Sequence, residues 1–383
     1  MTIRDSVIRH LADLVAFPTV SSASNLALNE HVSGFAARHG ARLRSFPDES
    51  GQKASLLISV GPEVEGGLVL SGHTDVVPVE GQDWTSDPFQ LTTQGERLVG
   101  RGATDMKGFV ACCLALLPQI AALPLRKPVH LALSYDEEVG CTGVWSMAEW
   151  VGQHLRPALA VIGEPTMMRL VEAHKVSCIG RVRLHGMAGH SSQPDRGVNA
   201  VMYAAELIHD IRRAEQELRS GPRLDLFDPP YSTTQVNRIQ GGTAGNIIAE
   251  DCWFSWEFRM IPGQDHAPCL TRLQALADQL TAQMRQVSGH AGITIEQDAL
   301  VPGLAPMQDR QLVEMLLTML GQDHGLGVSY GTEAGIFQRF GTPSCVIGPG
   351  TIEDAHRPDE SVDIAQLEAC CDFLMQLVRR MAL

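Results

Sequence analysis

The chain has 383 residues, of which 44% are hydrophobic, and a formal net charge of −14. This length exceeds what a single hydrophobic core normally organises, so two domains are expected. The acidic balance argues against a nucleic-acid partner and against docking on an anionic membrane, because both carry charge of the same sign. The totals fit a soluble globular enzyme.

The amino terminus and the cysteines predict a cytoplasmic protein. Residues 1–17 place Val7, Leu11 and Leu14 at helical spacing, which is typical of an amphipathic surface helix and not of a signal peptide. The longest apolar run, residues 109–125, is interrupted by two prolines and is too short to span a bilayer. The nine cysteines form no CxxC pair and fall partly in apolar helical stretches, as reduced, buried thiols do.

Three apolar runs in the first half predict strands that end in polar residues, over residues 67–75, 129–140 and 158–166. Helices are expected between them, over residues 105–122 and 143–153. This alternation predicts an α/β fold with a largely parallel sheet and helices on both faces. The runs "GVSYGTEAG" and "PSCVIGPG" are expected to join the same sheet. Sites in such sheets form at the carboxyl ends of the strands, where all three polar clusters lie.

From about Val176 the pattern changes to β-α-β-β-α-β, the order of a ferredoxin-like unit. Its strands are expected at "VSCIGRVRLHG", "TTQVNRIQ", "EDCWFSWEFRM" and "GITIEQ", with helices over residues 198–217 and 266–287. We therefore predict one discontinuous domain, residues 1–175 and 291–383, and a second domain, residues 176–290, inserted into it.

The first strand ends in His73 and Asp75, two positions apart. Residues i and i+2 of an extended chain point to the same side, so one side chain can hold the other. Such a pair suits a metal-bound histidine steered by an acid, a catalytic acid–base couple, or a buried hydrogen bond without chemistry.

Further acids and one further histidine follow the other strand ends. Two imidazoles and three carboxylates could hold two zinc ions, because three carboxylates and a bridging hydroxide would nearly neutralise four positive charges. A free carboxylate beside them could then move a proton. Asp105 could instead be a helix N-cap, and Asp136 could be exposed to solvent. The candidates besides His73 and Asp75 are Asp105, Asp136, Glu137, Glu138, Glu164 and His356.

The segments "SGHTDVVPV", "GRGATDMKG", "DEEVG", "GEPT", "GHSSQP" and "GPGTIEDAHRPDE" resemble, in order, the two-zinc aminoacylase and carboxypeptidase-type amidohydrolases. The resemblance covers nearly the whole chain. It implies one metal on His73, Asp105 and Glu164 and another on Asp105, Glu138 and His356, with Asp105 bridging. It further implies zinc, which cobalt could replace, and a cis peptide bond after Asp105. Glu137 would be the general base and acid, and Asp75 would orient the ring of His73.

For the inserted domain the resemblance implies a lid and a homodimer interface. His190 would reach into the partner's site and stabilise the oxyanion, and Asn246 and Arg259 would bind substrate. Arg259 suits a bidentate hold on an α-carboxylate, although it could simply pair with Glu257. Glu333 could recognise a side-chain amine or be structural. Val176 stands where the family commonly has glycine, which affects the expected hinge.

The implied activity is hydrolysis of the acetamide of N2-acetyl-L-ornithine to L-ornithine and acetate, a reaction of arginine biosynthesis. The alternatives within the same chemistry are succinyl-diaminopimelate, another N-acyl amino acid or a dipeptide. A third possibility is a binding protein that has kept the fold without the reaction. Such a scaffold would be expected to lose Glu137 or a metal ligand, and the sequence retains them all.

Overall fold

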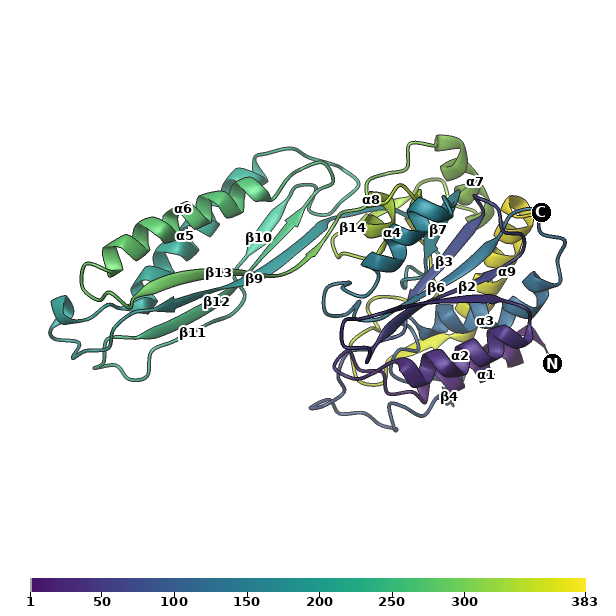
Figure 1. Ribbon diagram of the computed structural model, residues 1–383, viewed down its shortest axis with the longest axis horizontal. Coiled ribbons are helices and arrows are strands. Elements are labelled where there is room, and N and C mark those ends of the chain that lie inside the picture. The colour runs from purple at the N-terminus through teal and green to yellow at the C-terminus, as the bar shows by residue number, and fades with distance from the viewer. Residues whose placement is uncertain (1) are drawn as a thin grey trace. The chain divides into compact units, whose positions relative to one another are not determined.

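A computed structural model describes residues 2–383, and the chain divides into two compact units (Figure 1). The first unit comprises Met1–Ala173, Leu304–Gly327 and Thr332–Leu383, and the second comprises His174–Gly303 and Val328–Gly331. The boundary predicted at residues 290 and 291 is too early. Strand β13 (Gly292–Val301) pairs with β9 (Val176–His185) along most of its length, so it belongs to the second unit.

An eight-stranded sheet organises the first unit in the order β1-β2-β6-β3-β7-β15-β8-β14. The four adjacent strands β6, β3, β7 and β15 run parallel, whereas β1, β2 and β8 join by antiparallel pairing. The predicted α/β fold with a largely parallel core is confirmed. The strands are β1 (Arg42–Pro47), β2 (Ala54–Val60), β3 (Leu68–His73), β6 (Val129–Ser134), β7 (Leu159–Ile162), β8 (Val171–His174), β14 (Leu326–Val328) and β15 (Ser344–Val346).

One expected strand of this sheet is shorter than predicted. The run "GVSYGTEAG" contributes only the end of β14, and its "GTEAG" portion instead leads into helix α8 (Ala334–Arg339). Thr332 and Glu333 precede this helix, and the Thr332 hydroxyl accepts a hydrogen bond from the Ala334 N–H. This hydrogen bond from the backbone to a side chain two residues earlier favours a turn into the helix where the apolar pattern suggested a strand.

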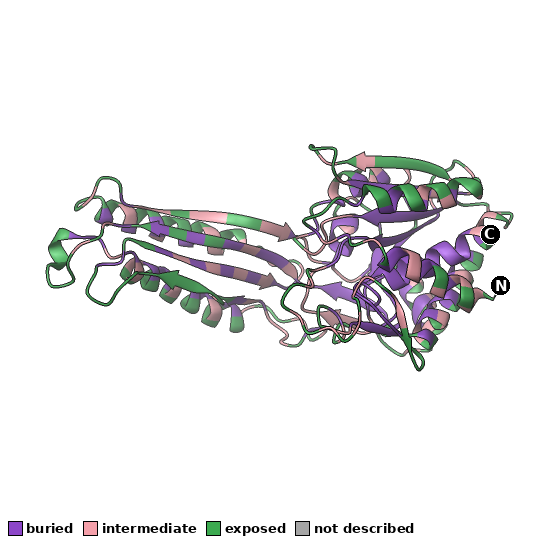
Figure 2. Cartoon of the chain, turned by 90° about the horizontal axis from the view of Figure 1, so that it is seen from below, coloured by how far each residue is buried: buried purple, intermediate pink, exposed green. Residues whose placement is uncertain are grey.

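Helices cover both faces of the sheet, as the near-continuous apolar strands require. Helix α3 (Lys107–Ala121) contacts β3 and β6, while α4 (Trp145–His154) contacts β2 and α8 contacts β7 and β15. Figure 2 shows the central strands of this sheet as buried, whereas the edge strand β1 is largely exposed. The other helices of the unit are α1 (Ile3–Val15), α2 (Leu26–Arg38), α7 (Arg310–Leu320) and α9 (Ile364–Met381).

A small antiparallel sheet in the first unit has the order β16-β5-β4. Its strands are β4 (Thr92–Gln94), β5 (Arg97–Val99) and β16 (Ser361–Asp363), and Val99 pairs with Ser361. This pairing brings the segment before α3 beside the segment before α9. Residues far apart in the sequence, near positions 100 and 360, are thereby neighbours.

The second unit has an antiparallel sheet in the order β10-β12-β9-β13, with β11 beside β12. This is the strand order of the predicted ferredoxin-like unit, with its second strand divided in two. Buried and less buried residues alternate along β12, and the buried ones form the core with α5 and α6 (Figure 2). The remaining elements are α5 (Ala200–Arg219), β10 (Thr233–Gln235), β11 (Ile239–Gly241), β12 (Asp251–Met260), α6 (Ala267–Met284) and the short 3-10 helix Pro194–Arg196.

Between residues 2 and 383, every helix lacks an apolar stretch long enough to cross a bilayer.

Candidate metal centre

The two histidines of the predicted site meet at one carboxylate. His73, the last residue of β3, places Nε2 2.9 Å from Oδ1 of Asp105, and His356 places Nε2 3.1 Å from Oδ2 of the same residue. His73 is fully buried and Asp105 is 5% exposed, whereas half of the His356 side chain is exposed. One carboxylate thus faces two imidazoles, as expected of a bridging ligand.

Two glutamates complete this arrangement from neighbouring strand ends. Glu164 follows β7, and its Oε1 lies 3.8 Å from His73 Nε2. Glu138 follows β6, and its Oε2 lies 3.0 Å from His356 Nε2. The five predicted ligands therefore gather at the carboxyl ends of the parallel strands, with Asp105 between the two histidines.

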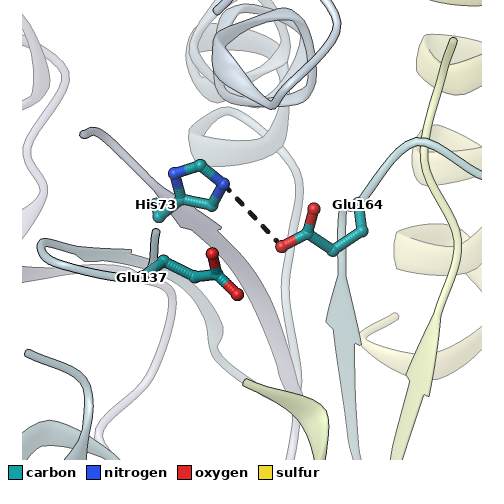
Figure 3. Close-up of side chains that lie close together, drawn as sticks. All are labelled: His73, Glu137 and Glu164. Atoms are coloured by element: carbon teal, nitrogen blue, oxygen red, sulfur yellow. Dashed lines mark ion pairs between the residues drawn. The ribbon is translucent and has the colours of Figure 1, made fainter. Parts of the chain in front are cut away.

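Glu137 lies within the same group of acids. Figure 3 shows its carboxylate beside His73 and Glu164, and ligand atoms of these three residues lie within 4.8 Å of one another. Its Oε1 accepts a hydrogen bond from the Cys141 thiol at 3.3 Å. Glu138 contacts His356 while Glu137 lies beside His73 and Glu164, so these adjacent acids have different partners.

Asp75 holds more than the ring of His73. His73 Nδ1 lies 2.9 Å from the backbone carbonyl of Asp75 and 3.5 Å from its carboxylate. The carboxylate accepts hydrogen bonds from the backbone N–H groups of Glu137 and Glu138, at 3.1 and 3.3 Å, and from the Ser21 hydroxyl at 2.7 Å. Asp75 therefore connects the end of β3 to the segment that carries both glutamates.

Two alternatives for single residues are wrong. Helix α3 begins at Lys107 and its N-cap residue is Met106, so Asp105 does not cap it. Asp136 is not a solvated loop residue, because its largely buried carboxylate forms an ion pair with Lys53 at 2.7 Å. The Asp105–Met106 peptide bond is cis, as predicted.

The electrostatics of the cluster reflect crowded negative charge. Burial, reinforced by Glu138, raises the pKa of Glu137 to about 8, and burial together with Glu137 raises the pKa of Glu164 well above its usual range. Burial acts against a charged His73, but hydrogen bonds to Asp105 and Asp75 raise its pKa well above its ordinary value. Hydrogen bonds to Asp105 and Glu138 raise the pKa of His356 to about 10. The histidines are the cations nearest to these acids.

The residues fit a pair of divalent cations. Imidazole nitrogens and carboxylate oxygens are the ligand types that zinc takes in catalytic sites. The buried Oε1 of Glu164 has no hydrogen-bond partner among the described residues, which is costly for a carboxylate unless a cation contacts it. Within residues 2–383, two groups could hold an ion, namely His73, Glu137 and Glu164, and His73, Asp105 and Glu138.

Four further site residues were predicted, one in the first unit and three in the second. Glu333, in the first unit, is 1% exposed and accepts a hydrogen bond from the Ser71 hydroxyl at 3.3 Å. In the second unit, His190 pairs with Ile247 next to Asn246, and the exposed His190 ring accepts hydrogen bonds from Ser192. Arg259 is half-buried and contacts Glu257 at 3.3 Å.

Sequence reasoning missed several residues that hold the site together. Ser21 and Lys53 connect the amino-terminal segment to Asp75 and Asp136, and Glu360 and Arg101 form a buried pair beside Asp105. Glu360 stands four positions after His356 in "HRPDE", so only its proximity to a predicted ligand could have marked it.

The description "Peptidase family M20/M25/M40" belongs to the family model that matches residues 69–380. Acetylornithine deacetylase of Yersinia pseudotuberculosis is 36% identical over 379 residues, which cover 95% of each chain. Acetylornithine deacetylase of Erwinia tasmaniensis is 34% identical over 372 residues, again 95% of each chain.

Solved structures share the fold at low sequence identity. A metallo-carboxypeptidase of the M20 family from Sulfolobus solfataricus superposes with a TM-score of 0.75 at 17% identity, covering 98% of this chain and 99% of its own. A dinuclear metal-binding M20 peptidase from Bacillus subtilis gives a TM-score of 0.61 at 14% identity, covering 98% and 97% of the two chains.

Proposed function

The chain belongs to peptidase family M20/M25/M40, and from this membership we propose that it hydrolyses the acetamide of N2-acetyl-L-ornithine to L-ornithine and acetate. The proposed substrate rests on the sequence identity of 34–36% to curated acetylornithine deacetylases, over 95% of the chain. Arginine biosynthesis would be the pathway and the cytoplasm the compartment.

The proposed cofactors are two zinc ions, which cobalt could replace. His73, Asp105 and Glu164 would hold one ion, and Asp105, Glu138 and His356 the other, since these side chains meet within hydrogen-bonding or ion-pair distance. Divalent cations bound there would lower the pKa of a water molecule and polarise the scissile carbonyl.

The remaining steps fall to side chains of the chain itself. Glu137 would take a proton from the attacking water and deliver it to the departing amine. Asp75 would keep Glu137 and Glu138 in place through their backbone N–H groups and would hold the His73 ring. In a homodimer joined through the second unit, His190 would donate a hydrogen bond to the oxyanion of the partner's reaction.

Three further residues are proposed for substrate recognition. Arg259 would bind the α-carboxylate in a bidentate manner, and Asn246 would hydrogen-bond the substrate. Glu333 would receive the side-chain amine. When substrate binds, Arg259 would have to leave the Glu257 carboxylate or share its guanidinium between that carboxylate and the substrate.

A panel of substrates with added zinc tests this proposal. We expect N2-acetyl-L-ornithine to give the highest kcat/KM among acetylornithine, succinyl-diaminopimelate, acetylmethionine and a dipeptide. A chelator should abolish turnover, and zinc or cobalt should restore it. If acetylornithine turns over no faster than acetylmethionine, the enzyme is a broader N-acyl-amino-acid amidohydrolase of the same family. Absence of turnover with every acylated amine would contradict the proposal.

A further inference from the structure

Glu360 is a buried acid that has no part in the proposed reaction. It lies four residues after His356 and directly before β16, and it is 1% exposed. A carboxylate buried this deeply requires several hydrogen-bond donors to offset its desolvation. Its donors come from the segment that leads to Asp105.

Both oxygens of Glu360 accept hydrogen bonds from residues 101–105. Oε1 accepts from the backbone N–H groups of Thr104 and Asp105, each at 3.0 Å. Oε2 accepts from the backbone N–H of Gly102 at 3.0 Å and from Nη1 of Arg101 at 2.7 Å. One side chain therefore holds the backbone of the turn that presents Asp105.

Arg101 extends this network to His356. Its Nη2 donates to Oε1 of Gln82, and Nε2 of Gln82 donates to the backbone carbonyl of His356 at 3.0 Å. Its guanidinium is 1% exposed and lies 5.0 Å from the centre of the Trp84 ring. The network thus contacts the backbone of two residues whose side chains meet 3.1 Å apart, Asp105 and His356.

We infer that Glu360, acting through Arg101 and Gln82, is a positioning residue that sets the distance between Asp105 and His356 and so selectively supports one metal site. This inference rests on the proposed function, because it uses the ligand sets given there. The metal on Asp105, Glu138 and His356 takes two ligands from segments that the network holds. The metal on His73, Asp105 and Glu164 takes one.

A simple buried ion pair would behave differently. Removing one partner of such a pair lowers the free energy of unfolding but does not distinguish between two metal sites. Glu172 supplies the matched control, since it is a buried glutamate of the first unit that accepts a hydrogen bond from Arg310 at 2.9 Å. Within residues 2–383, its hydrogen-bond partner is Arg310 and not one of the proposed ligands.

The test is a zinc titration of the chelator-stripped full chain in competition with a chromophoric chelator, comparing Glu360→Gln with Glu172→Gln. A glutamine side chain has one accepting oxygen and one donating NH2 group. Its NH2 group would therefore face hydrogen-bond donors at the place of one of the two Glu360 oxygens. We expect Glu360→Gln to weaken one of two zinc sites by about 10–100-fold and to weaken the other, which takes only Asp105 from the segments held by the network, by a smaller factor. Glu172→Gln should keep both affinities even where its thermal stability falls.

Two zinc sites in Glu360→Gln with affinities within about twofold of the parent chain would overturn the inference. If this variant does not fold, the same zinc titration of Gln82→Ala, at the half-buried end of the network, tests the inference. Weakening of one site supports the inference, and unchanged affinities overturn it. A parent chain that binds no zinc would refute the proposed function, and the inference with it. If the parent chain has two zinc sites, the result for Glu360→Gln tests the inference alone.

Discussion

At the scale of single residues, side chains of the same type within the cluster have different contacts. Glu137 and Glu138 are neighbours in sequence, yet Glu138 meets His356 while Glu137 faces His73 and Glu164. Asp75 holds the turn after β6, because its carboxylate accepts hydrogen bonds from the backbone N–H groups of both glutamates. Adjacent acids can therefore have separate roles, one as a ligand and one as a proton carrier.

Glu137→Gln is expected to keep the metals and lose about 10²–10⁴-fold in kcat, because the amide cannot take up the proton. Steady-state kinetics and the metal content of the purified variant measure the two effects. Glu172→Gln is the control, since this buried glutamate pairs with Arg310 and not with a proposed ligand. A kcat for Glu137→Gln close to that of the control would remove Glu137 from the mechanism.

At the scale of elements, the loop after β15 packs closely against the turn that carries Asp105. Gly350, in the loop after β15, has φ +83°, and a Cβ there would lie 1.9 Å from the Thr104 hydroxyl oxygen. Thr104 precedes Asp105. The loop after β15 therefore packs directly against the turn that carries the proposed bridging ligand. A glycine is required both by the backbone angle and by the contact.

Gly350→Ala should lower the free energy of unfolding by about 2–4 kcal/mol, because it adds backbone strain to overpacking. Gly34→Ala is the control within helix α2, where a Cβ would meet only the Arg38 side chain at 3.9 Å. Alanine there should be neutral or stabilising by up to about 1 kcal/mol. Urea unfolding of both variants provides the comparison, and equal stabilities would contradict the packing argument.

The packing of α1 against α2 predicts a loss of stability in acid. His10 is 4% exposed and its ring meets Phe35 edge-on at 4.6 Å. Burial, assisted by Arg9, lowers the pKa of His10 from its ordinary value of 6.5 to about 4. The unfolded chain therefore takes up this proton first as the pH falls, and the folded state loses stability between about pH 6.5 and pH 4.

His10→Leu removes this titration. Relative to the parent chain, the free energy of unfolding of His10→Leu should rise by about 1.4 kcal/mol for each pH unit lowered between pH 6 and pH 4.5. Urea denaturation of the chelator-treated proteins across this range measures the difference. A difference that stays constant with pH would show that His10 does not contribute to acid sensitivity.

At the scale of the whole molecule, each unit has its own hydrophobic core. The second unit is almost continuous in sequence, and Trp256, Phe254 and Phe258 of β12 are buried with residues of α5 and α6. Its first and last strands are paired, with Ser177 opposite Val301, so the two ends of the insertion lie together. This arrangement lets the insertion leave and rejoin the first unit at one place.

A fragment of residues 174–303 is expected to fold by itself and unfold cooperatively, because it contains the complete sheet. A fragment of residues 176–290 lacks β13 and leaves the edge of β9 unpaired, so it should not unfold cooperatively. Circular dichroism and urea denaturation of the two fragments compare them. Equal cooperativity would show that β13 is dispensable and that the earlier boundary is adequate.

The sequence alone determined the features that depend on local pattern. Apolar runs ending in polar clusters predicted β3, β6, β7 and β15, and their shared direction predicted that His73, Glu137, Glu138 and Glu164 would gather at one edge, because the carboxyl ends of parallel strands coincide. Only the tertiary structure decided the contacts between distant segments. Glu360 reaches the turn of Asp105 through the pairing of β16 with β5, which has no signature within a local stretch of sequence. The sequence predicted "GITIEQ" as a strand of the second unit, but the full extent of β13, and with it the domain boundary, follows only from its pairing with β9. Long-range pairing is selected by the burial of whole faces, which only the folded chain provides.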